Sequence, residues 1–302
     1  MIEVIKPGLL DMVVDLGRPG LRALGVPAGG AADAVALARA NRCLSNADAA
    51  AGLELTLFGP VLRFVTGGRI VLAGAHMPVW VDGEKADFDS EINLPPGAIL
   101  QFGRAISGLR SWLAVAGGVE VPLVMGGRST FLPGGFGGYS GRALRAGDVL
   151  AVGEPVVREG DVLPRKSLLR QQSHCLRIVP GPQIEGFSDR ALAALGGQAG
   201  YRVLVDSNRV GIRLAGAKLV FCGDELPSQG VLPGAIQVPP DGQPIVLGWD
   251  GPVTGGYPVI AGVIAADLWK LAQCSPGDVL HFEFVGRAEA LAAWQDEIGL
   301  WS

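Results

Sequence analysis

The chain has 302 residues, of which 49% are hydrophobic and 18% are charged, so it can bury a sizeable core and has too few charges for intrinsic disorder. Its formal net charge is −4 and it contains no run of Lys or Arg, which disfavours nucleic acid and anionic membrane surfaces as partners. The longest stretches without a charge, residues 226–240 and 251–266, contain Pro and Gly and are shorter than the roughly 18–20 residues of a membrane span. No transmembrane helix is therefore expected.

The first residues and the cysteines indicate the compartment. Glu3 and Asp11 lie where a secretory signal would be apolar, and no small-residue cleavage site is offered, which predicts a cytoplasmic protein. The cysteines have neither the spacing of a disulfide framework nor that of a metal knuckle. They are Cys43, Cys175, Cys222 and Cys274. We expect them to be reduced and mostly buried, and we expect no metal site.

Short apolar runs between turn signals fill most of the chain, and Gly accounts for 46 residues, which together predict a turn-dense, mainly β protein. In chain order the predicted strands are 1–5, 61–65, 69–72, 79–81, 99–102, 112–115, 176–179, 201–205, 245–247, 259–264 and 279–284. Helical periodicity is present only over 31–44, 189–195 and 288–294. Helix is therefore expected to be the minority structure.

Three short strings recur in the same order and indicate two similar halves. A strand followed by Pro-Gly occurs at 2–8 and 176–181, PGAI at 96–99 and 233–236, and GDVL at 147–150 and 277–280. The alternative interpretation is that these are generic turn dipeptides. On the first interpretation the domains are residues 1–165 and 166–302, joined by a charged, Pro-containing linker over 154–172.

Several common nucleotide and hydrolase motifs are missing from the sequence. It has no phosphate-cradling P-loop and no GxSxG nucleophile elbow, and the Gly-rich run at 134–141 does not fit the GxGxxG spacing of a dinucleotide site. His76, His174 and His281 lie in three different segments without ligand spacing, so a structural or solvent-facing role is expected for each.

Four loops instead place charged and polar residues between glycines and prolines. These residues are Asp15 and Arg18 in 14–20; Arg128, Ser129 and Thr130 in 126–130; Gln237, Asp241 and Gln243 in 236–244; and Asp250, Thr254 and Tyr257 in 250–258. Any one loop is compatible with an ordinary tight turn. Four such loops together are more typical of the walls of a polar small-molecule site.

At these loops the sequence resembles the allophanate hydrolase subunit 2 family, also called the KipA or biotin-dependent carboxyltransferase-like family, which includes the C subunit of 5-oxoprolinase. The motifs that carry the resemblance are VDLGRPG at 14–20, GVPAGGAAD at 25–33, ANRCLSN at 40–46, LELTLFGP at 53–60, AVAGG at 114–118, GGRSTFLPGGFGGYSGRALRAGD at 126–148, PGPQ at 180–183, PGAIQVPPDGQPIVL at 233–247 and TGGYP at 254–258. They span nearly the whole chain. The resemblance implies two tandem cyclophilin-like β-barrel domains with a few short helices.

The resemblance also implies an activity. Members act with a KipI-like subunit and a LamB/YcsF-like subunit as an ATP-dependent hydrolase that opens a small cyclic amide, 5-oxoproline, to glutamate. Two alternatives remain open. One is a carboxyltransferase component that acts on urea or a related amide with carboxybiotin, and this chain contains no biotinylation sequence of its own. The other is a non-enzymatic antagonist of a KipI-like kinase inhibitor.

For the hydrolase, residue chemistry suggests three kinds of role. Asp15, Asp241 and Asp250 would hold ATP with Mg²⁺ or act as bases; Arg18, Arg128 and Arg209 would neutralise phosphate or a substrate carboxylate, with Ser129 and Thr130 beside them; Gln237, Gln243, Thr254 and Tyr257 would orient the amide. Where the family usually has SDR and SEG, this chain has Ser207-Asn208-Arg209 and Ser228-Gln229-Gly230. Two carboxylates have thus become amides, which removes charge and proton-accepting power.

The low proportion of charge also predicts assembly. Large apolar patches rarely stay exposed on soluble proteins, so we expect a stable complex with a KipI-like subunit, an active cleft between the two proteins, and self-association of the isolated chain. Arg128 is the residue of greatest interest, since its planar guanidinium offers a bidentate contact that Lys cannot reproduce. The alternative is that Arg128 only ties loops together by pairing with Glu54 or Asp148.

Overall fold

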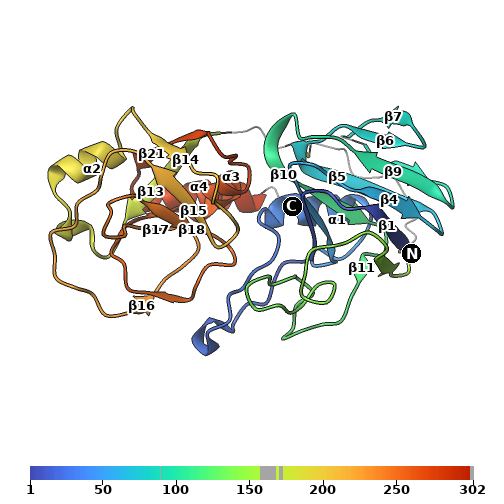
Figure 1. Ribbon diagram of the computed structural model, residues 1–302, viewed down its shortest axis with the longest axis horizontal. Helices are drawn as coiled ribbons and strands as arrows, with labels where there is room; N and C mark the ends of the chain where they lie inside the picture. The colour runs from blue at the N-terminus through green and yellow to red at the C-terminus, as the bar shows by residue number, and fades with distance from the viewer. Residues whose placement is uncertain (89, 157–167, 170–172, 300–302) are drawn as a thin grey trace. The chain divides into compact units, whose positions relative to one another are not determined.

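The computed structural model describes residues 1–88, 90–156, 168–169 and 173–299, and the chain divides into two compact units (Figure 1). Unit 1 comprises the described residues of Met1–Arg18 and Gly29–Gln171, and unit 2 comprises Pro19–Ala28 and those of Gln172–Leu300. The predicted domain boundary between residues 165 and 166 lies outside the described residues, as does most of the predicted linker. No helix among the described residues is long and apolar enough to cross a membrane.

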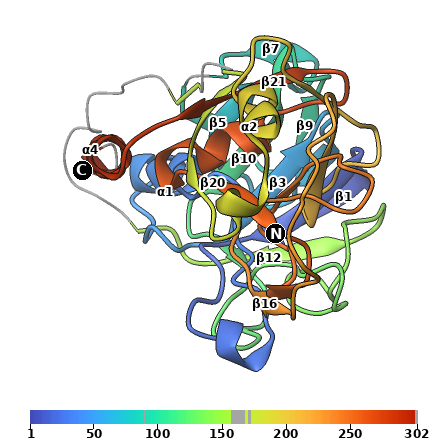
Figure 2. The same ribbon diagram turned by 90° about the vertical axis from the view of Figure 1, so that its left-hand side faces the viewer.

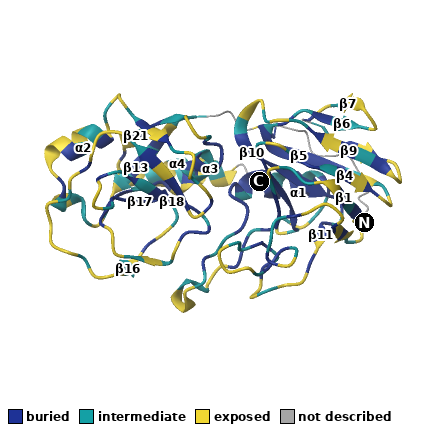
Figure 3. Cartoon of the chain, in the orientation of Figure 1, coloured by how far each residue is buried: buried dark blue, intermediate teal, exposed yellow. Residues whose placement is uncertain are grey.

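Unit 1 is built from two sheets that enclose one core. The seven-stranded sheet has the order β11 (Val119–Glu120), β12 (Val149–Val152), β1 (Ile2–Lys6), β4 (Val61–Phe64), β9 (Ala98–Phe102), β6 (Val79–Val81) and β7 (Glu84–Ala86). The five-stranded sheet has the order β2 (Leu10–Val14), β3 (Gly52–Thr56), β10 (Ser107–Val115), β5 (Gly68–His76) and β8 (Ile92–Leu94). Apolar side chains of both sheets, including Leu55, Leu62 and Leu113, meet in a single cluster. The buried strands are dark in Figure 3.

Helix α1 (Ala34–Cys43) packs on β10 and β5 of unit 1. It begins at Asp33, whose side chain accepts a hydrogen bond from the Ala36 amide and so satisfies one donor of the first turn. Because α1 packs on the face of β10 and β5 that does not point to the core, the buried part of β10 is covered on both faces, and Trp112 has no solvent exposure. Strand β3 is buried along its whole length, Glu54 included, so it does not show the alternation of a half-exposed strand.

In unit 2 the strands close into a barrel. Its order is β13 (Cys175–Pro180), β20 (Val259–Val263), β17 (Ala235–Gln237), β18 (Ile245–Leu247), β15 (Gly211–Ala215), β14 (Tyr201–Val203) and β21 (Val279–Phe284). A parallel pairing of β13 with β21 closes the ring, and Ile178, Ile236 and Phe282 lie in its core. A two-stranded ribbon, β16 (Gln229–Gly230) with β19 (Thr254–Gly255), stands apart from the barrel.

Short helices complete unit 2, as Figure 2 shows for α2 and α4. They are α2 (Asp189–Leu195), α3 (Leu268–Ala272) and α4 (Arg287–Gly299), with 3-10 turns at Arg22–Leu24, Ile184–Gly186 and Ala265–Asp267. The segment Pro19–Ala28 belongs to unit 2 although both its neighbours in sequence belong to unit 1, and the Arg22 guanidinium donates to the Val231 carbonyl.

The predicted fold class, mainly β with cyclophilin-like barrels and a few short helices, is confirmed, with the ring closed in unit 2 and the strands of unit 1 divided between two sheets. All eleven predicted strands and all three predicted helices overlap observed elements. The sequence pattern missed β2, β3, β15 and α3, among others. The expectation that the cysteines are mostly buried is wrong, because Cys175 and Cys222 are exposed and only Cys274 is buried.

The two units share a strand order that the recurring strings only partly mark. The order β12-β1-β4-β9-β6 in unit 1 matches β21-β14-β15-β18-β17 in unit 2. The GDVL strings begin the equivalent strands β12 and β21, and in each the Gly-Asp pair exchanges two backbone hydrogen bonds with one valine, Val4 or Val203. The PGAI strings, in contrast, begin β9 and β17, which are not equivalent in this order.

Candidate functional site

Five of the predicted site residues lie together in unit 1, and we call Asp15, Arg18, Arg128, Ser129 and Thr130 the Asp15 cluster. Asp15 directly follows β2, and its carboxylate accepts hydrogen bonds at both oxygens. Oδ1 accepts from the Gly17 amide at 2.8 Å and the Ser129 hydroxyl at 2.5 Å, and Oδ2 accepts from the Arg128 amide at 2.5 Å. Asp15 therefore joins two loops that are more than 110 residues apart in sequence.

Arg18 is buried beneath the same loops. Only 1% of it is exposed, its guanidinium donates to the Ser129 carbonyl, and its Cζ lies 5.1 Å from the centre of the Phe136 ring. Gly137, in the Gly-rich run, closes the site from the other side. A Cβ at this position would come within 2.2 Å of the Ser129 carbonyl oxygen, and its φ of 71° also favours glycine. The close approach of the Ser129 backbone thus explains why the Gly-rich run has glycine at position 137.

Thr130 and Arg128 also make internal contacts. The amide and the hydroxyl of Thr130 both donate to the Val13 carbonyl at 2.9 Å, and the half-buried Arg128 guanidinium donates to the Val121 carbonyl. The alternative pairing of Arg128 with Glu54 or Asp148 is wrong. Glu54 lies beside another arginine, with its Oε1 3.4 Å from Arg110 Nε.

Asp148 is held in the same way by a different arginine. The Arg142 guanidinium donates to both of its oxygens at 2.7 and 2.8 Å, and this contact, with the Arg145 amide, holds the pKa of Asp148 below its usual value. The charges of unit 1 that lie near these loops are therefore largely satisfied within the unit. Such an arrangement fixes loop geometry rather than presenting open ligands.

In unit 2, Arg209 and Asp250 form a buried ion pair. Arg209 Nε lies 2.8 Å from Asp250 Oδ2, its Nη2 lies 3.2 Å from Oδ1, and the Asp250 amide donates to the Arg209 carbonyl. Both residues are less than 5% exposed. The exposed Asn208, one of the two amides that replace family carboxylates, accepts from the Val210 amide at 2.8 Å. The Arg209–Asp250 pair fixes the turn after β18 to the start of β15.

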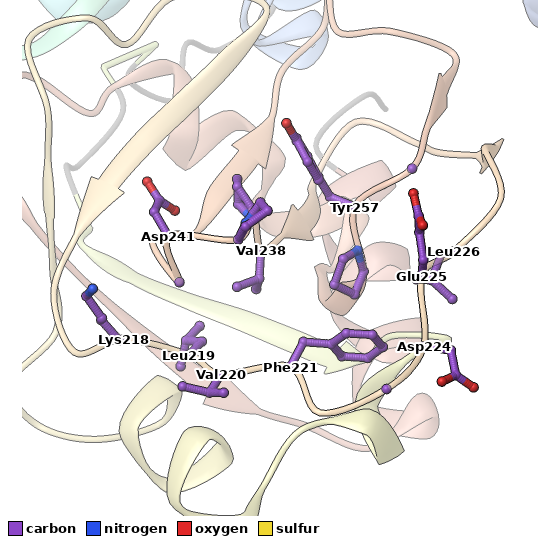
Figure 4. A pocket seen from close by; sticks show the side chains of 16 residues that line it. Lys218, Leu219, Val220, Phe221, Asp224, Glu225, Leu226, Val238, Asp241 and Tyr257 are labelled. Atoms are coloured by element: carbon purple, nitrogen blue, oxygen red, sulfur yellow. The ribbon is translucent and has the colours of Figure 1, made fainter.

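A cavity of about 720 Å³ lies entirely in unit 2, a size typical of small-molecule sites. Its walls are the segments 218–226, 238–242 and 256–258, drawn in Figure 4. Asp241 and Tyr257 are the predicted site residues that line it. Lys218 lies at the same end as Asp241, and Glu225 lies near Tyr257. We call this cavity the unit 2 pocket.

The other predicted residues of unit 2 stand behind or beside this pocket. Gln237 is 5% exposed and its amide nitrogen donates to the Tyr257 carbonyl at 3.4 Å. Gln243 exchanges two hydrogen bonds with the backbone of Gly216, as a strand residue would. Thr254 is exposed on the β16–β19 ribbon. The predicted residues therefore fall into groups in two different units.

Reasoning from the sequence missed Lys218, Phe221 and Glu225, which line the same pocket. Their segment, KLVFCGDEL, has neither strand alternation nor a helical period; charged and aromatic residues around one glycine are the signal that could have marked it. No group of three or more His, Cys, Asp or Glu residues suited to a metal ion occurs within the described ranges.

This mainly β chain, with its Asp15 cluster and its unit 2 pocket, is a carboxyltransferase-type domain. It belongs to the family described as "carboxyltransferase domain, subdomain A and B", whose sequence profile matches residues 24–284. The family relationship expected from the motifs is thereby confirmed.

Among curated proteins the chain is similar to the 5-oxoprolinase C subunit of Escherichia coli (strain K12), with 40% identity over 98% of this chain and 95% of that protein. It is also similar to urea amidolyase of Lachancea kluyveri, with 32% identity over 93% of this chain but only 17% of that protein. The crystal structure of the Kluyveromyces lactis urea carboxylase superimposes with a TM-score of 0.92 at 30% identity, over 100% of this chain and 29% of that one.

Proposed function

We propose that this chain is a subunit of an ATP-dependent cyclic-amide hydrolase that opens 5-oxoproline to glutamate. The observation that carries the proposal is the match to the C subunit of 5-oxoprolinase, in which 98% of this chain and 95% of the relative correspond at 40% identity. In urea amidolyase the corresponding region is a small part of a much longer chain. The correspondence over nearly the whole of the 5-oxoprolinase C subunit favours the 5-oxoprolinase role.

A KipI-like and a LamB/YcsF-like subunit are the proposed partners, and the geometry of this chain supports a need for them. An unstrained amide resists water, so the reaction requires both an activated carbonyl and a base. The two oxygens of Asp15 accept hydrogen bonds from neighbouring loops, and the two oxygens of Asp250 accept hydrogen bonds from Arg209. We propose that both carboxylates position loops and that a partner supplies the base.

Mg²⁺ with ATP, the expected cofactor of the complex, does not fit the predicted ligands of this chain. Asp15 and Asp250 are buried and make the hydrogen bonds just described, and Asp241, although exposed, accepts from the Gln243 amide in a local turn. A magnesium–nucleotide site needs carboxylates that face the phosphates. We therefore propose that these carboxylates do not bind the nucleotide and that a partner subunit mainly holds it.

We propose the unit 2 pocket as this chain's contribution to the substrate site. Lys218 is the one cationic side chain among the described residues that line it, which makes Lys218 the candidate for holding the substrate carboxylate. Tyr257 is 46% exposed, so its hydroxyl can donate to the lactam oxygen. Asp241 at the Lys218 end can accept the lactam N–H.

The test is to co-express the chain with its KipI-like and LamB/YcsF-like subunits and to measure glutamate formed in the presence of ATP and 5-oxoproline. Lys218→Met should raise the KM for 5-oxoproline, whereas Lys6→Met, which removes an exposed lysine of unit 1, should leave it unchanged. An intact complex that forms no glutamate would contradict the proposed function. A normal KM in Lys218→Met would contradict only the assignment of the pocket.

A carboxyltransferase role is the second candidate, because all of this chain superimposes on part of the urea carboxylase structure. That role requires carboxybiotin, which a separate carrier and a biotin carboxylase would have to provide. Reconstitution with those two proteins and urea, followed by measurement of ATP-dependent urea consumption, distinguishes it from the hydrolase.

A further inference from the structure

Three glutamine side chains surround the base of the β16–β19 ribbon, on the side of the unit 2 pocket formed by Tyr257 and Pro258. Gln183 and Gln229 face each other as a reciprocal amide pair: each Nε2 donates to the other's Oε1 at 3.0 Å. Gln237 lies under the ribbon, since a Cβ at Gly255 would come within 2.5 Å of its Nε2.

Two of these amides hold the pocket wall from its two ends. Gln183 Oε1 also accepts from the Val259 amide at 2.9 Å, and Gln237 Nε2 donates to the Tyr257 carbonyl at 3.4 Å. The residues between these two hydrogen bonds are Tyr257 and Pro258, both of which line the pocket. Backbone hydrogen bonds also hold this segment, from the Val238 amide to the Pro258 carbonyl and from the Gln183 amide to the Val259 carbonyl, and the Gln183 side chain adds one that depends on its own orientation.

The Val259 amide fixes that orientation, because only an oxygen can accept its hydrogen. With Gln183 Oε1 turned toward Val259, Gln183 Nε2 donates to Gln229 Oε1, and Gln229 Nε2 donates back to Gln183 Oε1 as its second hydrogen bond. A glutamine at position 229 can make both hydrogen bonds. An ionised glutamate has two acceptors and no donor, so it would face Gln183 Oε1 with a second oxygen.

We propose that Gln229 is a positioning residue that acts through Gln183 to set the place of Tyr257 in the pocket wall. The amide also keeps this side of the pocket free of a charge beyond those of Asp224 and Glu225, which line it already. If the proposed function holds, Gln229 thereby helps to place the Tyr257 hydroxyl that would donate to the lactam oxygen. The positioning role itself does not depend on the identity of the substrate.

The test uses the three tyrosines of the chain, Tyr139, Tyr201 and Tyr257, labelled as 3-fluorotyrosine and observed by fluorine NMR. The variant Tyr257→Phe assigns the Tyr257 signal. Tyr201 is buried in the barrel, where its hydroxyl donates to the Ala217 carbonyl, and it reports on the fold of unit 2. In Gln229→Glu at neutral pH we expect the Tyr257 signal alone to shift or broaden.

Acidification provides the rescue. In the Gln229→Glu variant the protonated carboxyl group at position 229 carries a hydrogen that can be donated to Gln183 Oε1, so the Tyr257 signal should return toward the wild-type position as that carboxyl protonates. Wild-type protein measured over the same pH range corrects for the other carboxylates that line the pocket, Asp224, Glu225 and Asp241. The matched control is Gln198→Glu, which adds the same charge at an exposed turn of unit 2 and should leave Tyr257 unchanged.

Three outcomes would overturn the proposal: a Tyr257 signal in Gln229→Glu identical to that of the wild type, a joint shift of Tyr257 and Tyr201, or a shifted Tyr257 signal that does not return on acidification. None of these readouts requires activity. A failure of the proposed function is therefore distinguishable from a failure of the positioning role proposed for Gln229.

Discussion

Asp11 allows a quantitative test of how unit 1 accommodates a buried carboxyl group. It lies in β2 opposite Leu55 of β3, is 1% exposed, and accepts one hydrogen bond, from the Gly8 amide to Oδ2 at 2.5 Å. Its Oδ1 has no hydrogen-bond partner among the described residues. Burial raises the pKa of Asp11 from 3.8 to about 7, against a smaller lowering by the Gly8 hydrogen bond.

The sign of the effect follows from proton binding in the two states. Between pH 3.8 and about 7 the folded state keeps the Asp11 proton while the unfolded state has lost it, so the free energy of unfolding falls as pH rises. A pKa difference of about 3 corresponds to about 4 kcal/mol at an upper limit, all of it lost by pH 8. Below pH 3.8 the Asp11 carboxyl is protonated in both the folded and the unfolded state, so it no longer makes the free energy of unfolding depend on pH.

Asp11→Asn removes this pH dependence, because an amide stays neutral and keeps an oxygen for the Gly8 amide. The variant should match the wild type near pH 4 and exceed its free energy of unfolding by up to about 4 kcal/mol at pH 8, as measured by urea denaturation across that range. Asp82→Asn is the control, since the exposed Asp82 also accepts one backbone hydrogen bond, from Ile99. A constant difference between Asp11→Asn and wild type from pH 4 to pH 8 would contradict a raised pKa for the buried Asp11 carboxyl group.

Three further substitutions test the contacts of the candidate site. Ser129→Ala removes the hydroxyl that donates to the Asp15 carboxylate and should lower the free energy of unfolding by about 1–3 kcal/mol in urea denaturation. Asp250→Asn leaves the buried Arg209 guanidinium without its counter-charge and should cost about 3–5 kcal/mol, seen as a large fall in Tm; an unchanged Tm would show that the pair is solvated. Arg128→Lys keeps the charge but loses the donor geometry toward the Val121 carbonyl, so it should lower the free energy of unfolding by about 1 kcal/mol. Unaltered stability together with weaker ligand binding in the complex would show instead that this guanidinium binds substrate.

Eleven of the 21 strands observed in the described residues were predictable, because each is a short run of apolar residues bounded by turn signals. The strands β2 and β3 were not, because each contains a carboxylate, Asp11 or Glu54, that the pattern treats as a sign of exposure. For Glu54 the compensating groups are distant in sequence, since its Oε2 accepts hydrogen bonds from the Ala32 amide and from the Trp112 indole. Hydrogen-bond partners this far away in sequence cannot be recognised in a short window of residues.

The sequence predicted which residues lie in the candidate site better than it predicted what each of them does. Charged residues between glycines marked Asp15, Arg128 and Ser129, which do meet. The same signal did not show that Arg209 and Asp250 neutralise each other, since pairing is a property of the folded chain. The pocket residue Lys218 went unmarked because its segment has no periodicity, and a cavity depends on the packing of three separate loops.

The hydrogen bonds of Asp15 have a consequence for how the chain folds during its synthesis. Strand β1 pairs with β4 on one side and with β12, near residue 150, on the other, and Asp15 binds a loop more than 110 residues later, so these contacts are complete only when most of unit 1 has left the ribosome. Pairing of such distant segments slows folding, because the loop between them must close first. During that interval β1 can pair with β4 and β2 with β3, but the edge of β1 that receives β12 stays open, so unit 1 should depend on slow translation or a chaperone more than a chain of local hairpins would.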